Sequence, residues 1–225
     1  MKKRIVKNLV WSIIPAKGKS SRVRNKNLKK ISNIELFLYS VLVAINTKKI
    51  SKTFVSTDDK KIAKISKKYG ALVPFLRPKK YSLKTSEDHE YISHFIKFIL
   101  KNYDLLPEYI VQLRPTTPFR SVIDINKALE YLKRNNTSTS LRSSHIADHP
   151  PEKQFRIRSN YYCNVNLKRD KRDLFNKPSQ LFKLTYEPNG YVDILKTNFL
   201  TKNIGKKIIY GQKILPLITL SLINI

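Results

Sequence analysis

The chain has 225 residues, 41% of them hydrophobic, which suits one globular domain with a substantial core. Its single cysteine excludes a disulfide framework and a cysteine-based zinc site within the chain. Lys and Arg number 45 against 16 Asp and Glu, a formal net charge of +29, but they are spread along the whole sequence without the interleaved aromatic residues of a nucleic-acid-binding platform.

Short apolar runs alternate with amphipathic segments in the first half of the chain. The predicted elements are a strand over 9–14, a helix over 35–46, a strand over 53–56, a helix over 59–69 and a strand over 73–76. Pro15 and Gly18 indicate that the first strand ends in a loop. Asp58 is expected to cap the second helix, which stops at Gly70.

The same alternation continues in the second half. The predicted elements are a strongly amphipathic helix over 88–103, a strand over 109–113, a helix over 122–133 capped by Ser121, and a strand over 137–141. The segment 148–183 reads as polar loops, and strands resume from Tyr191. Strands that alternate with helices predict an α/β fold with a mostly parallel sheet, whose ligands bind at the carboxyl ends of the strands.

A basic loop follows the first predicted strand. The sequence IPAKGKSSRVRNKN, 14–27, supplies cations, hydroxyl groups and a flexible glycine, and such a loop can wrap a polyphosphate. It matches neither GxxxxGK[ST] nor GxGxxG. From composition alone, a solvated basic loop and a phosphate site are equally expected.

This loop resembles the N-terminal signature of the acylneuraminate cytidylyltransferase family, in which IPARxGSKxxxxKN is typical. The resemblance continues in order through the following segments: VSTDD at 55–59, PFLRP at 74–78, LRPTTPFR at 113–120, PPEK at 150–153, PSQ at 178–180 and YEPNGYVDI at 186–194. It implies one domain over 1–225. The expected fold is a three-layer α/β fold with a mostly parallel, Rossmann-like sheet of the nucleotide-diphospho-sugar transferase type. A small irregular or β lobe over 143–190 is expected to serve substrate binding or dimerisation.

The resemblance also implies an activity. Members of this family are cytidylyltransferases that transfer CMP from CTP to an acidic nine-carbon 2-keto sugar of the sialic, legionaminic or pseudaminic acid type, and they release pyrophosphate. Mg²⁺ is the implied cofactor, and a homodimer is the implied assembly. With no apolar run of about 18 residues and no secretory signal, we expect a cytoplasmic protein without a membrane partner.

The matching positions imply the site residues. For catalysis they are Lys17 and Lys26. For nucleotide binding they are Ala16, Gly18, Ser20, Arg22, Asn27, Arg77, Thr85 and Ser86. For the sugar they are Arg114, Thr116, Lys153, Gln180 and Asn189. The cationic residues of this set suit the neutralisation of phosphate or carboxylate groups.

Two positions depart from the family pattern. Asn224 stands at the first position of the acidic Asp-x-Asp element that holds Mg²⁺ in the family, and Ser179 replaces the arginine of its PRQ element. The metal ligands of this chain are therefore not identifiable from the sequence. The sequence is compatible with a truncated chain, with metal ligands taken from the phosphates, or with a relative that binds nucleotide or sugar without turnover.

Several residues have simpler explanations that the sequence leaves open. Arg77 and Arg114 are also compatible with ordinary surface ion pairs, and Cys163 with a small buried residue. His145 and His149 lie four residues apart, but the following proline argues against a helical zinc pair. A nucleic-acid-binding protein driven by the charge of +29 remains the third alternative.

Overall fold

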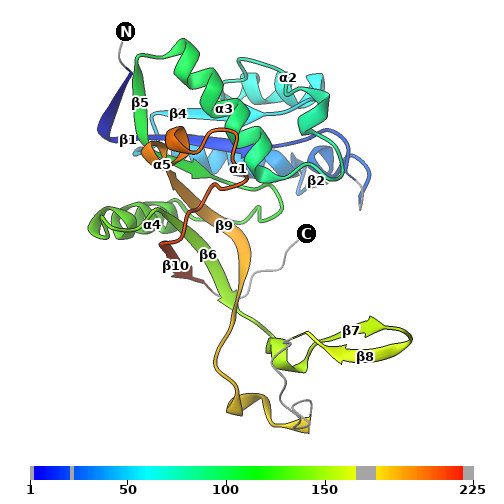
Figure 1. Cartoon of the computed structure of the whole chain (residues 1–225). Helices are drawn as coiled ribbons and strands as arrows, with labels where there is room; N and C mark the ends of the chain where they lie inside the picture. The colour runs from blue at the N-terminus through cyan, green and yellow to red at the C-terminus, as the bar shows by residue number, and fades with distance from the viewer. Residues whose placement is uncertain (1–2, 21–22, 166–175, 220–225) are drawn as a thin grey trace.

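The computed structural model describes residues 3–20, 23–165 and 176–219. Its centre is a six-stranded sheet in the order β10-β6-β9-β5-β1-β4 (Figure 1). The strands are β1 (Arg4–Pro15), β4 (Lys52–Ser56), β5 (Leu105–Gln112), β6 (Ser140–Ile146), β9 (Tyr186–Lys196) and β10 (Ile214–Ile218). Strand β1 runs parallel to both β4 and β5, and β10 runs parallel to β6, whereas β9 is antiparallel to its two neighbours. The predicted mostly parallel sheet is confirmed.

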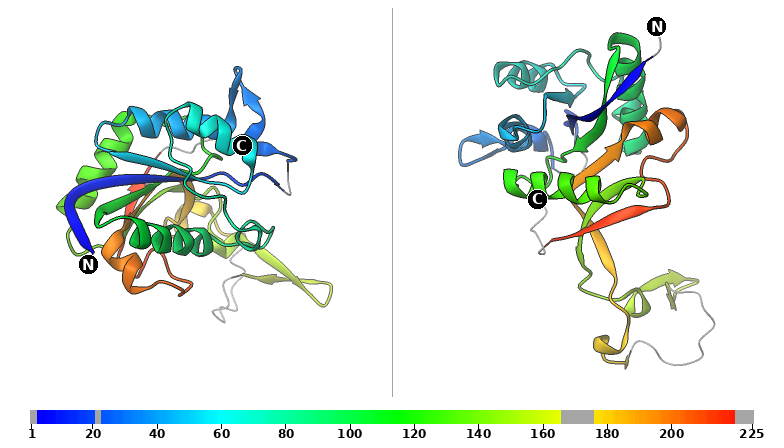
Figure 2. Two further views of the ribbon diagram at one scale, coloured as in Figure 1. Left: turned by 90° about the horizontal axis from the view of Figure 1, so that it is seen from above. Right: turned by 90° about the vertical axis from the view of Figure 1, so that its left-hand side faces the viewer.

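Helices cover both faces of the sheet, which gives three layers (Figure 2). They are α1 (Leu36–Asn46), α2 (Lys60–Lys68), α3 (Asp88–Asn102), α4 (Val122–Arg134) and α5 (Thr197–Lys202). Alternate side chains of β1 explain the layers: Val10 and Ile14 join the core under α1, α2 and α4, whereas Trp11 and Ile13 join the core under α3 and α5. The apolar runs of the sequence are thus strands that are buried on both faces.

Short elements complete the chain. Two small hairpins are formed by β2 (Lys30–Ile31) with β3 (Ile34–Glu35), and by β7 (Phe155–Arg158) with β8 (Tyr161–Asn164). Single 3-10 turns span Lys26–Leu28, Lys79–Tyr81, Pro151–Lys153 and Ser179–Leu181. The described residues between β6 and β9, 147–165 and 176–185, include the β7–β8 hairpin and project from the body as an arm (Figure 1).

Two sequence predictions near β4 are wrong. Asp59, not Asp58, caps α2, because its carboxylate accepts from the amides of Lys61 and Ile62 at 2.7 and 2.9 Å. The strand predicted over 73–76 is replaced by a single bridge between Leu72 and Phe54. Pro74 lacks the backbone N–H that a ladder needs, so pairing stops there.

Strand boundaries also differ from the predictions. Strand β1 begins at Arg4 instead of residue 9, because residues 4–6 pair with the start of β5 before a register shift around Asn8. Strand β6 covers 140–146 instead of 137–141. The two helices predicted over 35–46 and 88–103 agree with α1 and α3 within one residue.

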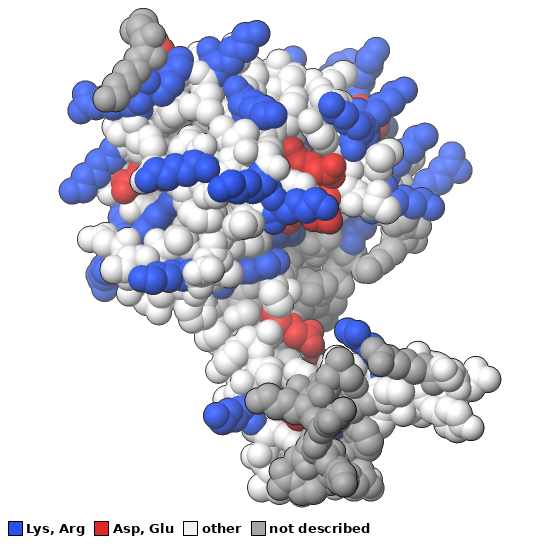
Figure 3. Space-filling model, in the orientation of Figure 1, with Lys and Arg blue, Asp and Glu red and all other residues white. Residues whose placement is uncertain are grey.

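The basic side chains are dispersed over the visible face of the body (Figure 3), as their spread along the sequence predicts. Lys and Arg side chains are scattered over the face of the body that Figure 3 shows, and they do not follow a single stripe. Across the described part of the chain, no helix is long and apolar enough to cross a bilayer.

Candidate active site

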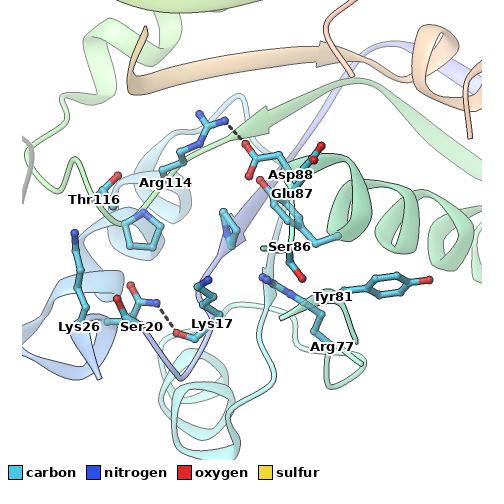
Figure 4. A pocket seen from close by; sticks show the side chains of 14 residues that line it. Lys17, Ser20, Lys26, Arg77, Tyr81, Ser86, Glu87, Asp88, Arg114 and Thr116 are labelled. Carbon is cyan, nitrogen blue, oxygen red and sulfur yellow. Dashed lines mark hydrogen bonds and ion pairs between the residues drawn. The ribbon is translucent and has the colours of Figure 1, made fainter. Parts of the chain in front are cut away.

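A pocket of about 380 Å³ opens at the edge of the sheet where β1, β4 and β5 end. Its walls are Pro15, Lys17, Ser20, Lys26, Asn27, Arg77, Tyr81, Ser86, Glu87, Asp88, Tyr91, Arg114, Pro115 and Thr116. Figure 4 shows Lys17 and Arg77 on the side opposite Arg114. Because parallel strands bring their carboxyl ends to one edge, segments far apart in the sequence meet here, as expected for this fold class.

The basic loop after β1 is held in place by its own polar contacts. The Lys17 side chain reaches the Leu83 carbonyl at 3.3 Å, and the Asn27 amide donates to the Lys17 carbonyl at 2.7 Å. The Gly18 amide donates to the Asp58 carboxylate at 2.8 Å, which is the contact that Asp58 makes instead of a helix cap. A Cβ at Gly18 would lie 2.8 Å from that of Asp59, so a glycine is required for this close approach.

Arg77 forms a second wall of the pocket although it is only 5% exposed. Its Nε donates to the Ser56 hydroxyl at 2.9 Å and its Nη2 to the Ser56 carbonyl, while the guanidinium lies 4.9 Å from the centre of the Tyr91 ring. Burial lowers the pKa of Arg77, and nearby Tyr91 and Asp58 partly offset this effect. Arginine stays protonated in proteins, so Arg77 presents a fixed positive charge.

Arg114 forms the opposite wall and is paired with two carboxylates. Its Nη2 donates to Asp88 at 2.5 Å and to the Tyr210 hydroxyl at 2.9 Å, and its Nη1 donates to the fully buried Asp193. Burial opposes the charge of Arg114, but Asp193, with Tyr91 and Asp88, outweighs it, and the pKa of Arg114 is raised well above its usual value.

Asp88 remains a carboxylate at the edge of the pocket. Burial alone would raise the pKa of Asp88, but the charge and hydrogen bond of Arg114, together with Gln112 and Tyr91, lower it below the ordinary value. Gln112 links the two walls, because its amide donates to Asp88 at 3.2 Å and to the Tyr91 hydroxyl at 2.6 Å.

Eight of the predicted site residues line this one pocket. They are Lys17, Ser20, Lys26, Asn27, Arg77, Ser86, Arg114 and Thr116. Ser86 also fixes the preceding turn, because its hydroxyl accepts from the Leu83 amide at 3.0 Å and donates to the Lys80 carbonyl at 3.2 Å.

The other predicted residues lie elsewhere. Ala16 is fully buried, Gly18 makes the backbone contact described above, and Thr85 is exposed next to Ser86. Lys153 and Gln180 belong to the arm, whereas Asn189 is buried in β9 and donates to the Thr219 hydroxyl at 2.6 Å. Arg22 lies outside the described residues.

The sequence did not identify the acidic and aromatic members of the pocket. Glu87, Asp88, Tyr81 and Tyr91 line it, but the sequence indicated only Asp88 and Tyr91, as the start and the apolar face of a predicted helix.

The described residues do not include a set of side chains that could by themselves coordinate a metal ion. No group of three His, Cys, Asp or Glu side chains occurs among them. Of the pocket carboxylates, Asp88 is engaged by Arg114, and Glu87 pairs with His89 at 3.1 Å. Asn224, at the position of the predicted acidic element, lies outside the described residues.

Two solved structures share this fold. The chain superposes on CMP:2-keto-3-deoxy-manno-octonic acid synthetase complexed with CTP with a TM-score of 0.63 and 12% identity, over 95% of this chain and 91% of that one. It superposes on 4-diphosphocytidyl-2C-methyl-D-erythritol synthase from Anaerococcus prevotii with a TM-score of 0.60 and 11% identity, over 93% and 86%. At these identities the likeness shows the fold alone.

Sequence comparisons give evidence for the family in addition to the fold. The chain is 28% identical to post-translational flagellin modification protein B of Campylobacter coli over 84% of its length and 78% of that protein. It is 27% identical to pseudaminic acid cytidylyltransferase of Campylobacter jejuni, over 72% and 65%. It is 32% identical to CMP-N,N'-diacetyllegionaminic acid synthase of Legionella pneumophila, over 55% of the chain and about half, 53%, of that protein. A model of the family described as "Cytidylyltransferase" matches residues 11–213, and the chain therefore belongs to the cytidylyltransferase family.

Proposed function

We propose that this protein transfers CMP from CTP to an acidic 2-keto sugar of the sialic, legionaminic or pseudaminic acid type and releases pyrophosphate. The observation that carries the proposal is the pocket at the strand ends, where Lys17, Lys26, Arg77 and Arg114 meet around one cavity. Two anionic substrates must approach each other there, and several fixed cations suit that task.

The proposed reaction is a substitution at phosphorus. The anomeric hydroxyl of the sugar attacks the α-phosphorus of CTP, a new P–O bond forms, the bond to the pyrophosphate breaks, and the hydroxyl proton is released. Such a transfer depends on positioning and on neutralisation of charge. Lys17 and Lys26 are proposed to neutralise the phosphate oxygens, and Asn27 supports Lys17 through the hydrogen bond to its carbonyl.

Two sets of residues are proposed to divide the substrates. The proposed nucleotide set is Ala16, Gly18, Ser20, Arg22, Asn27, Arg77, Thr85 and Ser86, of which Ser20, Asn27, Arg77 and Ser86 line the pocket. The proposed sugar set is Arg114, Thr116, Lys153, Gln180 and Asn189, of which Arg114 and Thr116 line the pocket. Lys153 and Gln180 lie on the arm and do not line the pocket, so their part in sugar binding is proposed from the family resemblance of their segments.

A requirement for Mg²⁺ belongs to the same proposal. The described residues do not form a complete set of protein ligands, and no step is assigned to the ion. Magnesium is commonly held by one or two carboxylates together with substrate phosphates, which is compatible with an ion that arrives with the triphosphate.

The test measures pyrophosphate release from CTP with sialic, legionaminic and pseudaminic acids in turn, each with Mg²⁺ or with excess EDTA. We expect release with one of these sugars, none in the sugar-free control and none with EDTA. If calorimetry detects CTP binding but no sugar supports release, the chain is a binding relative and the transferase proposal fails.

We further propose that the arm mediates a homodimer. Its exposed apolar side chains support this, since Ile157, Tyr161, Tyr162 and Leu181 are at least 70% exposed in the single chain. Such a group of apolar side chains is unusual on a monomer surface. Light scattering is expected to give twice the chain mass of 26.3 kDa, and a mass of one chain at micromolar concentration would contradict the dimer.

A further inference from the structure

Two residues that do not line the pocket, Asp193 and Tyr210, hold Arg114 in place. The sheet register places Gln112, Asp193 and Arg142 side by side on three adjacent strands. Cross-strand neighbours in register point to the same face of a sheet, here the face under α3 and α5. The fully buried Asp193 in the middle of this row accepts from Arg114 Nη1, and its other oxygen lies 3.8 Å from Arg142 Nε.

Tyr210 completes the support from the loop before β10. Its hydroxyl accepts from Arg114 Nη2 and donates to Asp193, both at 2.9 Å. The backbone of Tyr210 is fixed independently, because its carbonyl accepts from the hydroxyls of Thr139 at 2.6 Å and Ser140 at 2.8 Å. Loss of the Tyr210 hydroxyl should therefore leave the loop in place.

These contacts limit what Arg114 can do for a ligand. A guanidinium grips a carboxylate with two parallel N–H groups, either Nη1 with Nη2 or Nε with Nη2. Both arrangements need an N–H of Nη2, and its two N–H groups are donated to Asp88 and Tyr210. Arg114 thus has no fork available for a substrate carboxylate while this network is intact.

We propose that Asp193 and Tyr210 are positioning residues that hold Arg114 as a fixed cation in the pocket wall, and that Arg114 acts through this placement instead of a forked grip on substrate. Through Asp88, the same network fixes the first turn of α3 at the pocket edge. The kinetic part of this proposal rests on the proposed cytidylyl transfer, whereas the immobilisation of Arg114 does not.

The test replaces Tyr210 by phenylalanine, which keeps the ring and removes only the hydroxyl. The matched control is Tyr103→Phe, a tyrosine of the same core whose ring packs against Trp11 at a centroid distance of 4.9 Å, away from the pocket. Two readouts are needed: kcat and KM for each substrate, and the guanidinium NMR signals of Arg114, assigned with Arg114→Lys. An immobilised guanidinium gives separate Hη signals, whereas a rotating one gives an averaged signal.

In Tyr210→Phe we expect Hη signals that exchange faster than in the wild type, while Asp88 and Asp193 still hold the guanidinium. We also expect a fall in kcat/KM of about tenfold, the loss typical of one hydrogen bond to a charged group. Tyr103→Phe should match the wild type in both readouts, and melting curves should show both variants folded at the assay temperature. Hη signals in Tyr210→Phe that exchange no faster than in the wild type would overturn the proposal whatever the kinetics. Faster exchange with unchanged kcat/KM would also overturn it, because the placement of Arg114 would then not matter to the reaction.

A second variant, Asp193→Asn, tests the charge in the network. It leaves Arg114 and Arg142 facing each other without the carboxylate between them, so we expect a larger loss of kcat/KM than in Tyr210→Phe. An equal or smaller loss would contradict the role of Asp193. If the wild type shows no turnover, the proposed function fails, and the Arg114 signals of both variants still decide the inference.

Discussion

Replacement of Lys17 by methionine is expected to lower kcat by about a hundred- to a thousandfold, the range seen when one preorganised group is removed from developing charge. Lys17 lines the pocket, and the loop that carries it is fixed by Asn27 and by the contact with Leu83. Methionine keeps much of the side-chain length and removes the charge. The measurement is steady-state pyrophosphate release at saturating CTP.

Lys101→Met provides the control for this prediction. Lys101 is an exposed residue in the last turn of α3, outside the pocket, and its replacement changes the net charge by the same amount. It should leave kcat unchanged. A Lys17→Met enzyme with the wild-type kcat would remove Lys17 from the catalytic set.

Replacement of Arg120 by methionine is expected to lower the free energy of unfolding by about 3 kcal/mol or more, because buried acceptors would lose their donor. Arg120 donates to the carbonyls of Tyr191, Gly190 and Arg114 and to the Ser40 hydroxyl, and so ties the segment after β5 to β9 and α1. Burial lowers the pKa of Arg120 to about 9, and the charge of Arg114 acts in the same direction.

Urea denaturation measures this effect. Arg134→Met, at the exposed end of α4, is the control and should change the free energy of unfolding by less than about 0.5 kcal/mol. An Arg120→Met protein as stable as the control variant would show that water replaces the four donated hydrogen bonds without cost.

Much of the architecture could be predicted because hydrophobic periodicity records burial. The run around Trp11 is apolar on both faces, and the residues 88–103 carry one apolar stripe, so strand and helix were distinguishable. The predictions failed where one backbone group decided the outcome. Pro74 ended a predicted strand, and two adjacent aspartates exchanged the roles of helix cap and loop anchor.

The candidate site was predictable only where a short motif carried it. Lys17, Arg77 and Arg114 belong to segments with a recognisable order, and the parallel strands bring them together. The partners of Arg114 were not predictable, because Asp193 and Tyr210 lie 79 and 96 residues away along the chain. No local pattern records a contact at that separation.

The most direct test of the central claim is pyrophosphate release with CTP compared with UTP and ATP, at a fixed concentration of the sugar that supports turnover. A cytidylyltransferase should release pyrophosphate with CTP, one equivalent for each CMP-sugar formed, and give only background with UTP and ATP. Equal release with all three nucleotides, or release without formation of a CMP-sugar, would contradict the proposed function.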